Sequence, residues 1–308
     1  MNELDRKEII EFINKNNYGI CYEDYSFKMI TTLKVGGLIK IMYYPNCDDS
    51  LIAVIKYLKE RNIPYFIIGN GSNILASDDE YNGVVISLKR IANQFIIEKE
   101  NEKYKVIVNS GCSVKKFNEF LVDYSLKGFE AISSIPATIG GIVTMNASCY
   151  GFVTSNYVRR VQVIKNNNIV WIDNKDLEFS YRNSKILKEK LIVLKIEFEF
   201  EKDDKNKINE RIEHYYQKRK NTQPINLKSA GSTFKNNEYL KAWEIITYLG
   251  LKGYRIGDAM VSNHHANFLV NIGNAKSIDF YNLIEYIKNK AKNVLNEELK
   301  TEWILINF

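Results

Sequence analysis

The chain of 308 residues is poor in the residues that break or cross-link protein structure, with 4 prolines, 16 glycines and 4 cysteines. The cysteines are Cys21, Cys47, Cys112 and Cys149, which are far apart and form no CxxC pair. This pattern excludes a zinc ribbon and a disulfide scaffold. We therefore expect a reducing, cytoplasmic environment.

Long apolar runs are also lacking, and none approaches the roughly 20 residues that a membrane helix needs. The N-terminus, MNELDRKEIIEFINKNN, is charged from its start and has no signal-peptide core. Histidines number only 3, and the pair His264-His265 has no third ligand at a suitable spacing. We expect no membrane insertion and no metal site, and we interpret the histidine pair as structural.

A strong excess of one charge is lacking too, since the chain has 43 Lys and Arg residues and 37 Asp and Glu residues, which gives a net charge of +6. The surplus is diffuse and fits anionic small molecules as well as nucleic acid. No basic stripe interleaved with aromatic residues is present, so we expect no nucleic-acid binding. The 45% hydrophobic and 26% charged residues are typical of globular domains, and the length suggests two or three of them.

Hydrophobic periodicity predicts an α+β protein with a β-rich N-terminal two-thirds. The expected helices cover residues 5–16, 48–61, 113–124, 201–220, 240–249 and 277–295. The expected strands lie at 38–44, 64–68, 83–88, 94–98, 104–109, 158–165, 169–172, 191–200, around 260, 268–271 and 302–306, with a loop-rich tract over 128–151. The polar segment 201–220 is the best candidate for a domain boundary.

The first glycine cluster is Gly69-Asn70-Gly71-Ser72-Asn73, directly after an expected strand. Glycines let successive backbone N–H groups converge on an anion, and the Ser and Asn side chains add donors. The following segment is a strand and not a helix, so a Rossmann site is disfavoured. A plain tight turn remains the alternative for this pentapeptide.

The second cluster runs from Ser134 to Gly151, about 65 residues later. Gly140-Gly141 permits close backbone approach, Pro136 fixes the entry of the loop, and Asn146 supplies an amide edge. A structural loop under a sheet is the alternative. Two such loops at strand ends nevertheless favour a nucleotide or flavin site.

Eight motifs in one order resemble the UDP-N-acetylenolpyruvoylglucosamine reductase family. They are 69–73, 135–151, Phe179-Ser-Tyr-Arg-Asn-Ser184, Gln223-Pro224, Ser229-Ala-Gly-Ser-Thr-Phe-Lys-Asn236, Leu251-Lys-Gly253, Val261-Ser262 through Asn271, and Glu302. The resemblance covers residues 31–306, in the family's compact type without an extra tyrosine-bearing loop.

The resemblance implies an FAD domain of the PCMH/vanillyl-alcohol-oxidase-like type over residues 1–200, with subdomains of about 1–70 and 71–200, and a substrate domain over 201–308. It implies non-covalent FAD, NADPH as reductant, a UDP-sugar substrate and a role in peptidoglycan synthesis, hence in cell wall biogenesis, cell shape and cell division. We expect a monomer. The cofactor would be bound by Gly69, Asn70, Gly71, Ser72, Asn73, Pro136, Thr138, Gly140, Gly141, Asn146 and Gly151.

The resemblance also assigns three catalytic residues. Arg182 would hold the substrate carboxylate, for which its planar fork is suited. Ser232 would donate the proton to the second carbon, and Glu302 would act at the carboxylate in its protonated form. In isolation, the arginine could be a surface strand residue paired with a glutamate, the serine a turn residue, and the glutamate an exposed strand end.

The substrate-binding residues implied by the resemblance are Tyr150, Tyr181, Lys220, Lys235 and Asn236. For Lys220, at the end of the basic run 218–220, a solvated helix end is an equal alternative to a diphosphate contact.

Some positions depart from the family pattern. Ser134, Ala137 and Ser148 stand where the resemblance has glycine, which predicts a shifted pyrophosphate or weaker FAD affinity. Asn237 and Trp303 replace a usual proline and valine. Cys149 is interpreted as a small packing residue, with a covalent flavin link as the alternative. Two other functions stay open: another FAD oxidoreductase of the same fold, and a flavin- or nucleotide-binding protein without turnover.

Overall fold

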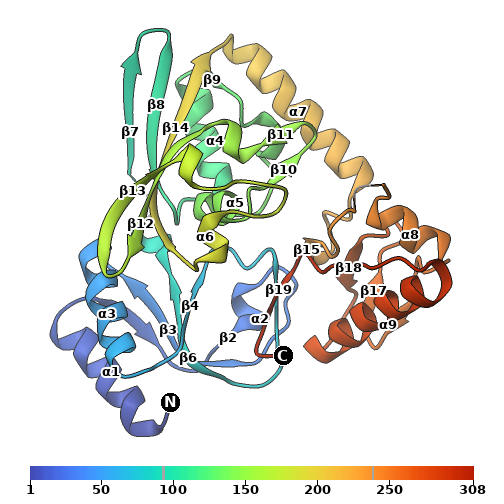
Figure 1. The fold of residues 1–308 in the computed structure, drawn as a ribbon, viewed down its shortest axis with the longest axis horizontal. Coiled ribbons are helices and arrows are strands. Elements are labelled where there is room, and N and C mark those ends of the chain that lie inside the picture. The colour runs from blue at the N-terminus through green and yellow to red at the C-terminus, as the bar shows by residue number, and fades with distance from the viewer. Residues whose placement is uncertain (92–93, 238) are drawn as a thin grey trace. The chain divides into compact units, whose positions relative to one another are not determined.

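The computed structural model describes residues 1–91, 94–237 and 239–308. Contacts within the chain divide it into two compact units. Figure 1 labels the helices and strands of the chain. Unit 1 comprises residues 1–23, 41–70 and 82–217. Unit 2 comprises residues 24–40, 71–81 and 218–308, so it is assembled from three separate stretches of sequence.

The first sheet lies largely in unit 1 and has the strand order β1-β3-β6-β4, with β2 also on β3. Its strands are β1 (Gly19–Tyr22), β2 (Tyr25–Ser26), β3 (Leu38–Pro45), β4 (Tyr65–Ile68) and β6 (Tyr81–Ser87), and its helices are α1 (Glu3–Lys15) and α3 (Asp48–Glu60). The apolar face predicted for 48–61 is buried in one core with residues of β3 and β6. That burial is why the α3 segment folds as a helix here.

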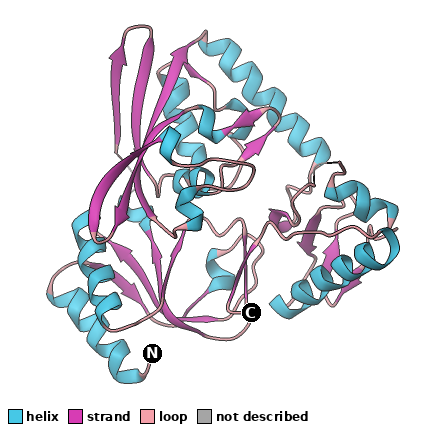
Figure 2. Cartoon of the chain, in the orientation of Figure 1, coloured by secondary structure: helices cyan, strands magenta, loops and turns pink. Residues whose placement is uncertain are grey.

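The second sheet of unit 1 is antiparallel, with the order β13-β12-β14-β8-β7 and β9 on β14. Its strands are β7 (Phe95–Glu100), β8 (Lys103–Asn109), β9 (Leu126–Lys127), β12 (Val158–Lys165), β13 (Asn168–Asp173) and β14 (Ile192–Lys202). Also in this unit are α4 (Val114–Asp123), α5 (Ile139–Thr144), α6 (Lys185–Lys188), β10 (Ser148–Cys149), β11 (Phe152–Val153) and most of α7 (Lys205–Thr222). Figure 2 shows β7 and β8 as a long hairpin. Phe117 of α4 packs on Phe129 and Phe198 at ring-centroid distances of 5.3 and 5.4 Å, which anchors the helix to the sheet.

Unit 2 contains a four-stranded sheet of order β15-β18-β17-β16 and a parallel pair of β5 and β19. Its elements are α2 (Phe27–Ile30), β5 (Ile74–Ala76), β15 (Lys228–Ser232), α8 (Ala242–Tyr248), β16 (Arg255–Ile256), β17 (Ala259–Val261), β18 (Phe268–Asn271), α9 (Ser277–Leu295) and β19 (Ile304–Ile306). Helix α9 buries Phe280, Leu283 and Ile284 in the same core as Trp303. The carboxylate of Asp78 accepts the backbone N–H groups of Ser277 (3.0 Å) and Ile278 (3.1 Å) and thereby stabilises the start of α9.

Three sequence-based expectations are corrected by the structure. The helix expected over 201–220 starts at Lys205, because Glu201 and Lys202 continue β14 and pair with β9. The last strand starts at Ile304 and leaves Glu302 just before it. The tract 128–151 contains the short helix α5, which was expected as loop. No helix in the described part of the chain is long and apolar enough to cross a membrane.

Candidate active site

In unit 1, Gly69 and Asn70 of the first glycine cluster lie against the second cluster. The Asn70 side-chain amide donates to the carbonyl oxygen of Pro136 (2.8 Å), and Lys89 Nζ donates to Asn70 Oδ1 (2.9 Å). A Cβ atom at Gly69 would lie 2.4 Å from Thr138 Oγ1. Since real Cβ contacts do not reach that distance, glycine at position 69 is required for this approach.

The start of α5 forms the base of the second cluster. Thr138 Oγ1 accepts the N–H of Gly141 (3.3 Å), and the N–H of Gly140 donates to the carbonyl oxygen of Ser110 (2.8 Å). A Cβ atom at Gly140 would lie 2.8 Å from Ser110 Cβ. Glycine is therefore needed here for packing within unit 1.

The segment 146–151 is tied to the turn that carries Arg182. Asn146 donates through Nδ2 to the Ser180 carbonyl oxygen (3.0 Å), and its Oδ1 accepts the N–H of Ser155 (3.0 Å). Gly151 has a φ of +86°, and a Cβ atom there would meet nothing within 4 Å. Glycine at position 151 therefore allows the positive φ, and its α-carbon borders open space. Asn146 instead links two loops through its side chain.

Arg182 lies at the tip of a tight turn closed by reciprocal backbone hydrogen bonds between Ser180 and Asn183 (3.1 Å each). Its φ is +52°, in the left-handed region that costs a non-glycine residue roughly 1–2 kcal/mol. The guanidinium donates from Nη1 to Ser148 Oγ (2.7 Å) and from Nη2 to the Ser148 carbonyl oxygen (3.2 Å). The arginine is thus a turn residue bonded to Ser148.

The predicted substrate tyrosines of unit 1 border the same loops. The ring of Tyr181 lies 5.0 Å from the Arg182 guanidinium carbon and is 51% exposed. Tyr150 stacks on Tyr215 with a centroid distance of 5.8 Å. Cys149 donates to the Ala131 carbonyl oxygen (3.4 Å) and packs against the core, which agrees with a packing role.

In unit 2, the second half of the first glycine loop lies beside the segments that carry Ser232 and Glu302. Asn73 Nδ2 donates to the Glu302 carbonyl oxygen (3.2 Å), and the Ile304 N–H donates to the Asn73 carbonyl oxygen (3.0 Å). The Glu302 N–H in turn donates to the carbonyl oxygen of Thr233 (2.8 Å), the residue after Ser232. These bonds bring three motifs of the sequence together.

Thr32 strengthens this arrangement, although no sequence motif pointed to it. Its N–H donates to the Gly71 carbonyl oxygen (3.1 Å), and its Oγ1 donates to the Ser229 carbonyl oxygen (2.6 Å). Gly71 has a φ of +63°, and a Cβ atom there would lie 2.5 Å from the Ile30 carbonyl oxygen. Only glycine fits this position.

The remaining predicted substrate residues of unit 2 lie at its surface or near it. Lys220 is exposed near the end of α7, and Lys235 is bonded through its backbone N–H to the Lys300 carbonyl oxygen (2.8 Å). Asn236 Oδ1 accepts the N–H of Ala242 (3.0 Å) at the start of α8. The side chain of Asn236 therefore helps to begin a helix.

His265 is a structural residue by its contacts. Its Nδ1 accepts the Asn267 N–H (3.2 Å), and burial lowers its pKa from the usual 6.5. Within the described residues, no group of three His, Cys, Asp or Glu side chains is arranged to hold a metal ion.

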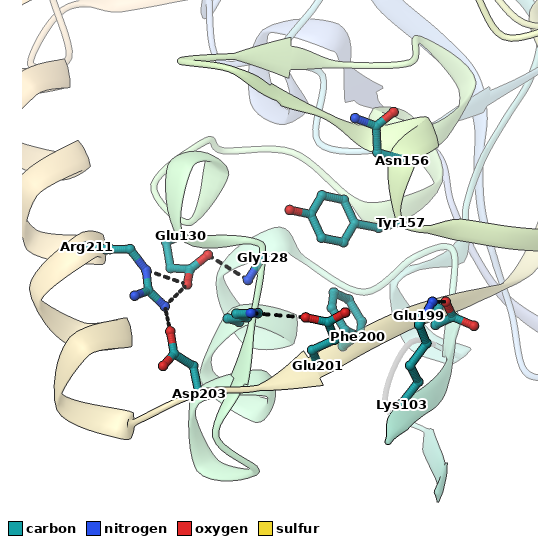
Figure 3. Close-up of a pocket in the computed structure, with 11 residues that line it drawn as sticks. Lys103, Gly128, Glu130, Asn156, Tyr157, Glu199, Phe200, Glu201, Asp203 and Arg211 are labelled. Carbon is teal, nitrogen blue, oxygen red and sulfur yellow. Dashed lines mark hydrogen bonds and ion pairs between the residues drawn. The ribbon is translucent and has the colours of Figure 1, made fainter. Parts of the chain in front are cut away.

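A cavity of about 630 Å³ in unit 1 is lined by none of the predicted site residues (Figure 3). Its carboxylates are paired with neighbouring cations: Glu130 and Asp203 with Arg211, Glu199 with Lys103, and Glu201 with Lys127. Two of these pairs link β14 to β8 and β9, and the other two link Arg211 of α7 to Glu130 and to Asp203, the residue after β14. Ion pairs that satisfy one another in this way indicate a structural network more than a reaction site.

Comparison with known proteins gives matches over most of the chain. A family model described as the C-terminal domain of UDP-N-acetylenolpyruvoylglucosamine reductase matches residues 223–306, and an FAD-binding domain model matches residues 39–172. A UDP-N-acetylenolpyruvoylglucosamine reductase of Caldanaerobacter subterraneus subsp. tengcongensis is 38% identical over 92% of this chain and 93% of the relative. That of Clostridium novyi is 39% identical over 97% and 92%. The crystal structure of the Thermus caldophilus reductase aligns with a TM-score of 0.79, at 28% identity over 94% of this chain and 98% of that one.

Proposed function

Since this chain belongs to the UDP-N-acetylenolpyruvoylglucosamine reductase family, we propose that Arg182, Ser232 and Glu302 carry its chemistry. The chain is an FAD-dependent oxidoreductase of peptidoglycan synthesis that acts on a UDP-sugar. The α+β class and the FAD-binding domain expected from the sequence are confirmed. The division into domains at residue 200, the site residues, the monomeric state and the cytoplasmic location are proposals.

The glycine clusters fit FAD. No hydrogen bond within the described part of the chain is donated by the backbone amides of residues 70–73, so these N–H groups suit a phosphate. The open space at Gly151 suits a ring system on the second cluster. FAD bound there would supply the hydride-transfer chemistry between NADPH and the enolpyruvyl group of the substrate.

The residues of unit 2 would handle the proton. Addition of hydride to the terminal vinyl carbon leaves negative charge on the neighbouring carbon and carboxylate, and stabilising that charge is where catalysis gains most. Ser232 donates a proton to the second carbon, and Glu302, in its protonated form, acts as the acid at the carboxylate. The observation that carries this proposal is the chain of bonds from Asn73 to Glu302 and from Glu302 to Thr233.

By the family resemblance, Arg182 of unit 1 would bind the substrate carboxylate. A guanidinium has five N–H donors in a planar fork and stays charged at every working pH. Tyr150, Tyr181, Lys220, Lys235 and Asn236 would bind the rest of the substrate.

The test is to measure the two half-reactions, flavin reduction and flavin re-oxidation, separately in the Ser232→Ala variant. Flavin reduction by NADPH should stay within about a few-fold of the wild-type rate, whereas re-oxidation by the substrate should slow by about 10²–10⁴-fold, the usual value of a positioned acid. Equal losses in both halves would make the serine structural.

Acid precipitation should release the flavin into the supernatant, and flavin retained in the pellet would indicate a covalent link at Cys149.

A further inference from the structure

The Arg182 guanidinium is held at two points by one residue. Nη1 donates to Ser148 Oγ at 2.7 Å and Nη2 donates to the Ser148 carbonyl oxygen at 3.2 Å. The shorter bond is the one to the hydroxyl. Serine at position 148 therefore supplies an acceptor that a glycine, the residue suggested there by family resemblance, would lack.

The hydroxyl bond orients the side chain without being needed to close the loops. Two other bonds already join the segment 144–148 to the turn: Asn146 Nδ2 to the Ser180 carbonyl oxygen (3.0 Å), and Ser184 Oγ to the Thr144 carbonyl oxygen (2.7 Å). Ser148 is also fixed by pairing with Val153 in the β10–β11 hairpin. The backbone positions of Ser148 and Arg182 are thus set independently of the Ser148 hydroxyl.

Arg182 needs such an orienting contact because of where it lies. The residue is at the tip of a two-residue turn, half-buried, with a φ of +52°. A long, flexible side chain at a turn tip has many rotamers, and ordering them before the reaction removes an entropic cost from the reaction itself.

We propose that Ser148 is a positioning residue, whose hydroxyl holds the Arg182 guanidinium in the orientation that meets the substrate carboxylate. This inference rests on the proposed role of Arg182. It also gives a function to one of the positions where glycine is replaced, in place of the expected effect on FAD affinity.

The experiment measures substrate-driven re-oxidation of the reduced flavin over a range of substrate concentrations, in Ser148→Ala, Ser148→Gly and Ser148→Thr. Removal of the hydroxyl should lower the limiting rate about three- to tenfold, since a half-exposed hydrogen bond to a charged group is lost. The Thr variant keeps an acceptor and should stay within about twofold of wild type. If only the substrate concentration for half-maximal rate rises and the limiting rate is unchanged, the hydroxyl contributes to substrate binding alone, and the proposal is overturned.

Ser184→Ala is the matched control. It also removes one serine hydroxyl bond between the same two loops, and it removes the Leu187 N–H cap of α6 as well. We expect this variant to unfold at a lower temperature while keeping its limiting rate. An equal loss of rate in Ser184→Ala and Ser148→Ala would show a merely structural effect.

A double-mutant cycle with Arg182→Lys distinguishes this inference from the proposed function. In the Lys background, Ser148→Ala should change the rate by less than about twofold, because the fork it orients is gone. An undiminished effect would overturn the inference. If Arg182→Lys alone re-oxidises at the wild-type rate, the role of Arg182 itself fails. If Arg182→Lys is slow and Ser148→Ala is not, only the inference fails.

Discussion

The two units hold their proposed catalytic residues in different ways. In unit 1, the guanidinium of Arg182 is bonded to Ser148, on a turn with left-handed backbone. In unit 2, the segments that carry Ser232 and Glu302 are joined by backbone hydrogen bonds, to which the side chains of Asn73 and Thr32 add one bond each. Backbone bonds persist through most side-chain substitutions, whereas a side-chain bond is lost with a single one. The comparison predicts that substitutions around the site in unit 1 will change the orientation of the Arg182 side chain. Substitutions in unit 2 should instead affect the proton chemistry assigned to Ser232 and Glu302.

The largest effect in unit 1 is expected from Arg182→Lys. Lysine keeps the positive charge but has no planar fork, so re-oxidation by the substrate should slow by about 10²-fold. Stopped-flow absorbance of the flavin measures this rate. Arg159→Lys is the control, because Arg159 forms ion pairs with Glu100 and Glu199 on the surface of the sheet and should keep the wild-type rate. A rate for Arg182→Lys equal to that of this control would contradict the role of the fork.

The corresponding change in unit 2 is Glu302→Gln. The amide still donates a hydrogen bond but has no proton to give up, so we expect re-oxidation to slow about tenfold or more. If the protonated carboxyl is the active form, the wild-type rate should decline as the pH rises, and the Gln variant should lose this decline. Rates of substrate-driven re-oxidation across pH test both points. A Gln variant with the wild-type profile and rate would leave Arg182 and Ser232 as the supported residues.

Asn73→Ala tests the side-chain part of the unit 2 network. Loss of the bond to the Glu302 carbonyl oxygen should lower the free energy of unfolding by about 1 kcal/mol and slow re-oxidation about a few-fold. Denaturant unfolding and the same kinetic assay measure the two effects. Asn168→Ala removes a surface bond of the same type, from Nδ2 to the Asn166 carbonyl oxygen, and should leave both quantities unchanged. A loss of activity as large as that of Glu302→Gln would mean that the backbone bonds alone do not hold the segment.

The smallest effect concerns His265 of unit 2 and the pH dependence of stability. Burial lowers the folded-state pKa, so the unfolded chain takes up the proton first as the pH falls below about 6.5. Stability supplied by the neutral ring is therefore present above that pH and is lost on acidification. The unfolding temperatures of wild type and His265→Asn are measured from about pH 7.5 to about pH 5. The unfolding temperature should fall more steeply with decreasing pH in wild type. Parallel curves would mean that the ring has the same pKa in both states.

The core-forming elements were predictable from the sequence because their signals are local. The face of α3 with Leu51, Val54 and Leu58, and the long apolar stretch of β14, follow the expected periods and are buried. The start of α7 was missed, because Glu201 and Lys202 carry a helix-like composition while pairing as the end of β14. α5 was missed because its glycines argue against a helix, and packing against Ser110 outweighs that preference.

The sequence also indicated most of the candidate site, but not its supporting residues. Motif order was enough to assign Arg182, Ser232 and Glu302 as hypotheses. Thr32 lies in none of the motifs and Ser148 departs from one of them, and a serine or threonine hydroxyl becomes informative only when its partner is known. Ser148 was interpreted as a lost glycine, and the contact that gives it a role comes from a residue 34 positions later in the chain.

The sequence by itself therefore determined the fold class, the family and the flavin chemistry of this protein, because periodicity and motif order are properties of the chain. Only the tertiary structure decided that residues 24–40 and 71–81 belong with residues 218–308, and that Asn73 reaches Glu302 across 229 positions. The physical reason is that a hydrogen bond depends on distance in space, which strand pairing and core packing set, and the spacing of residues along the sequence does not.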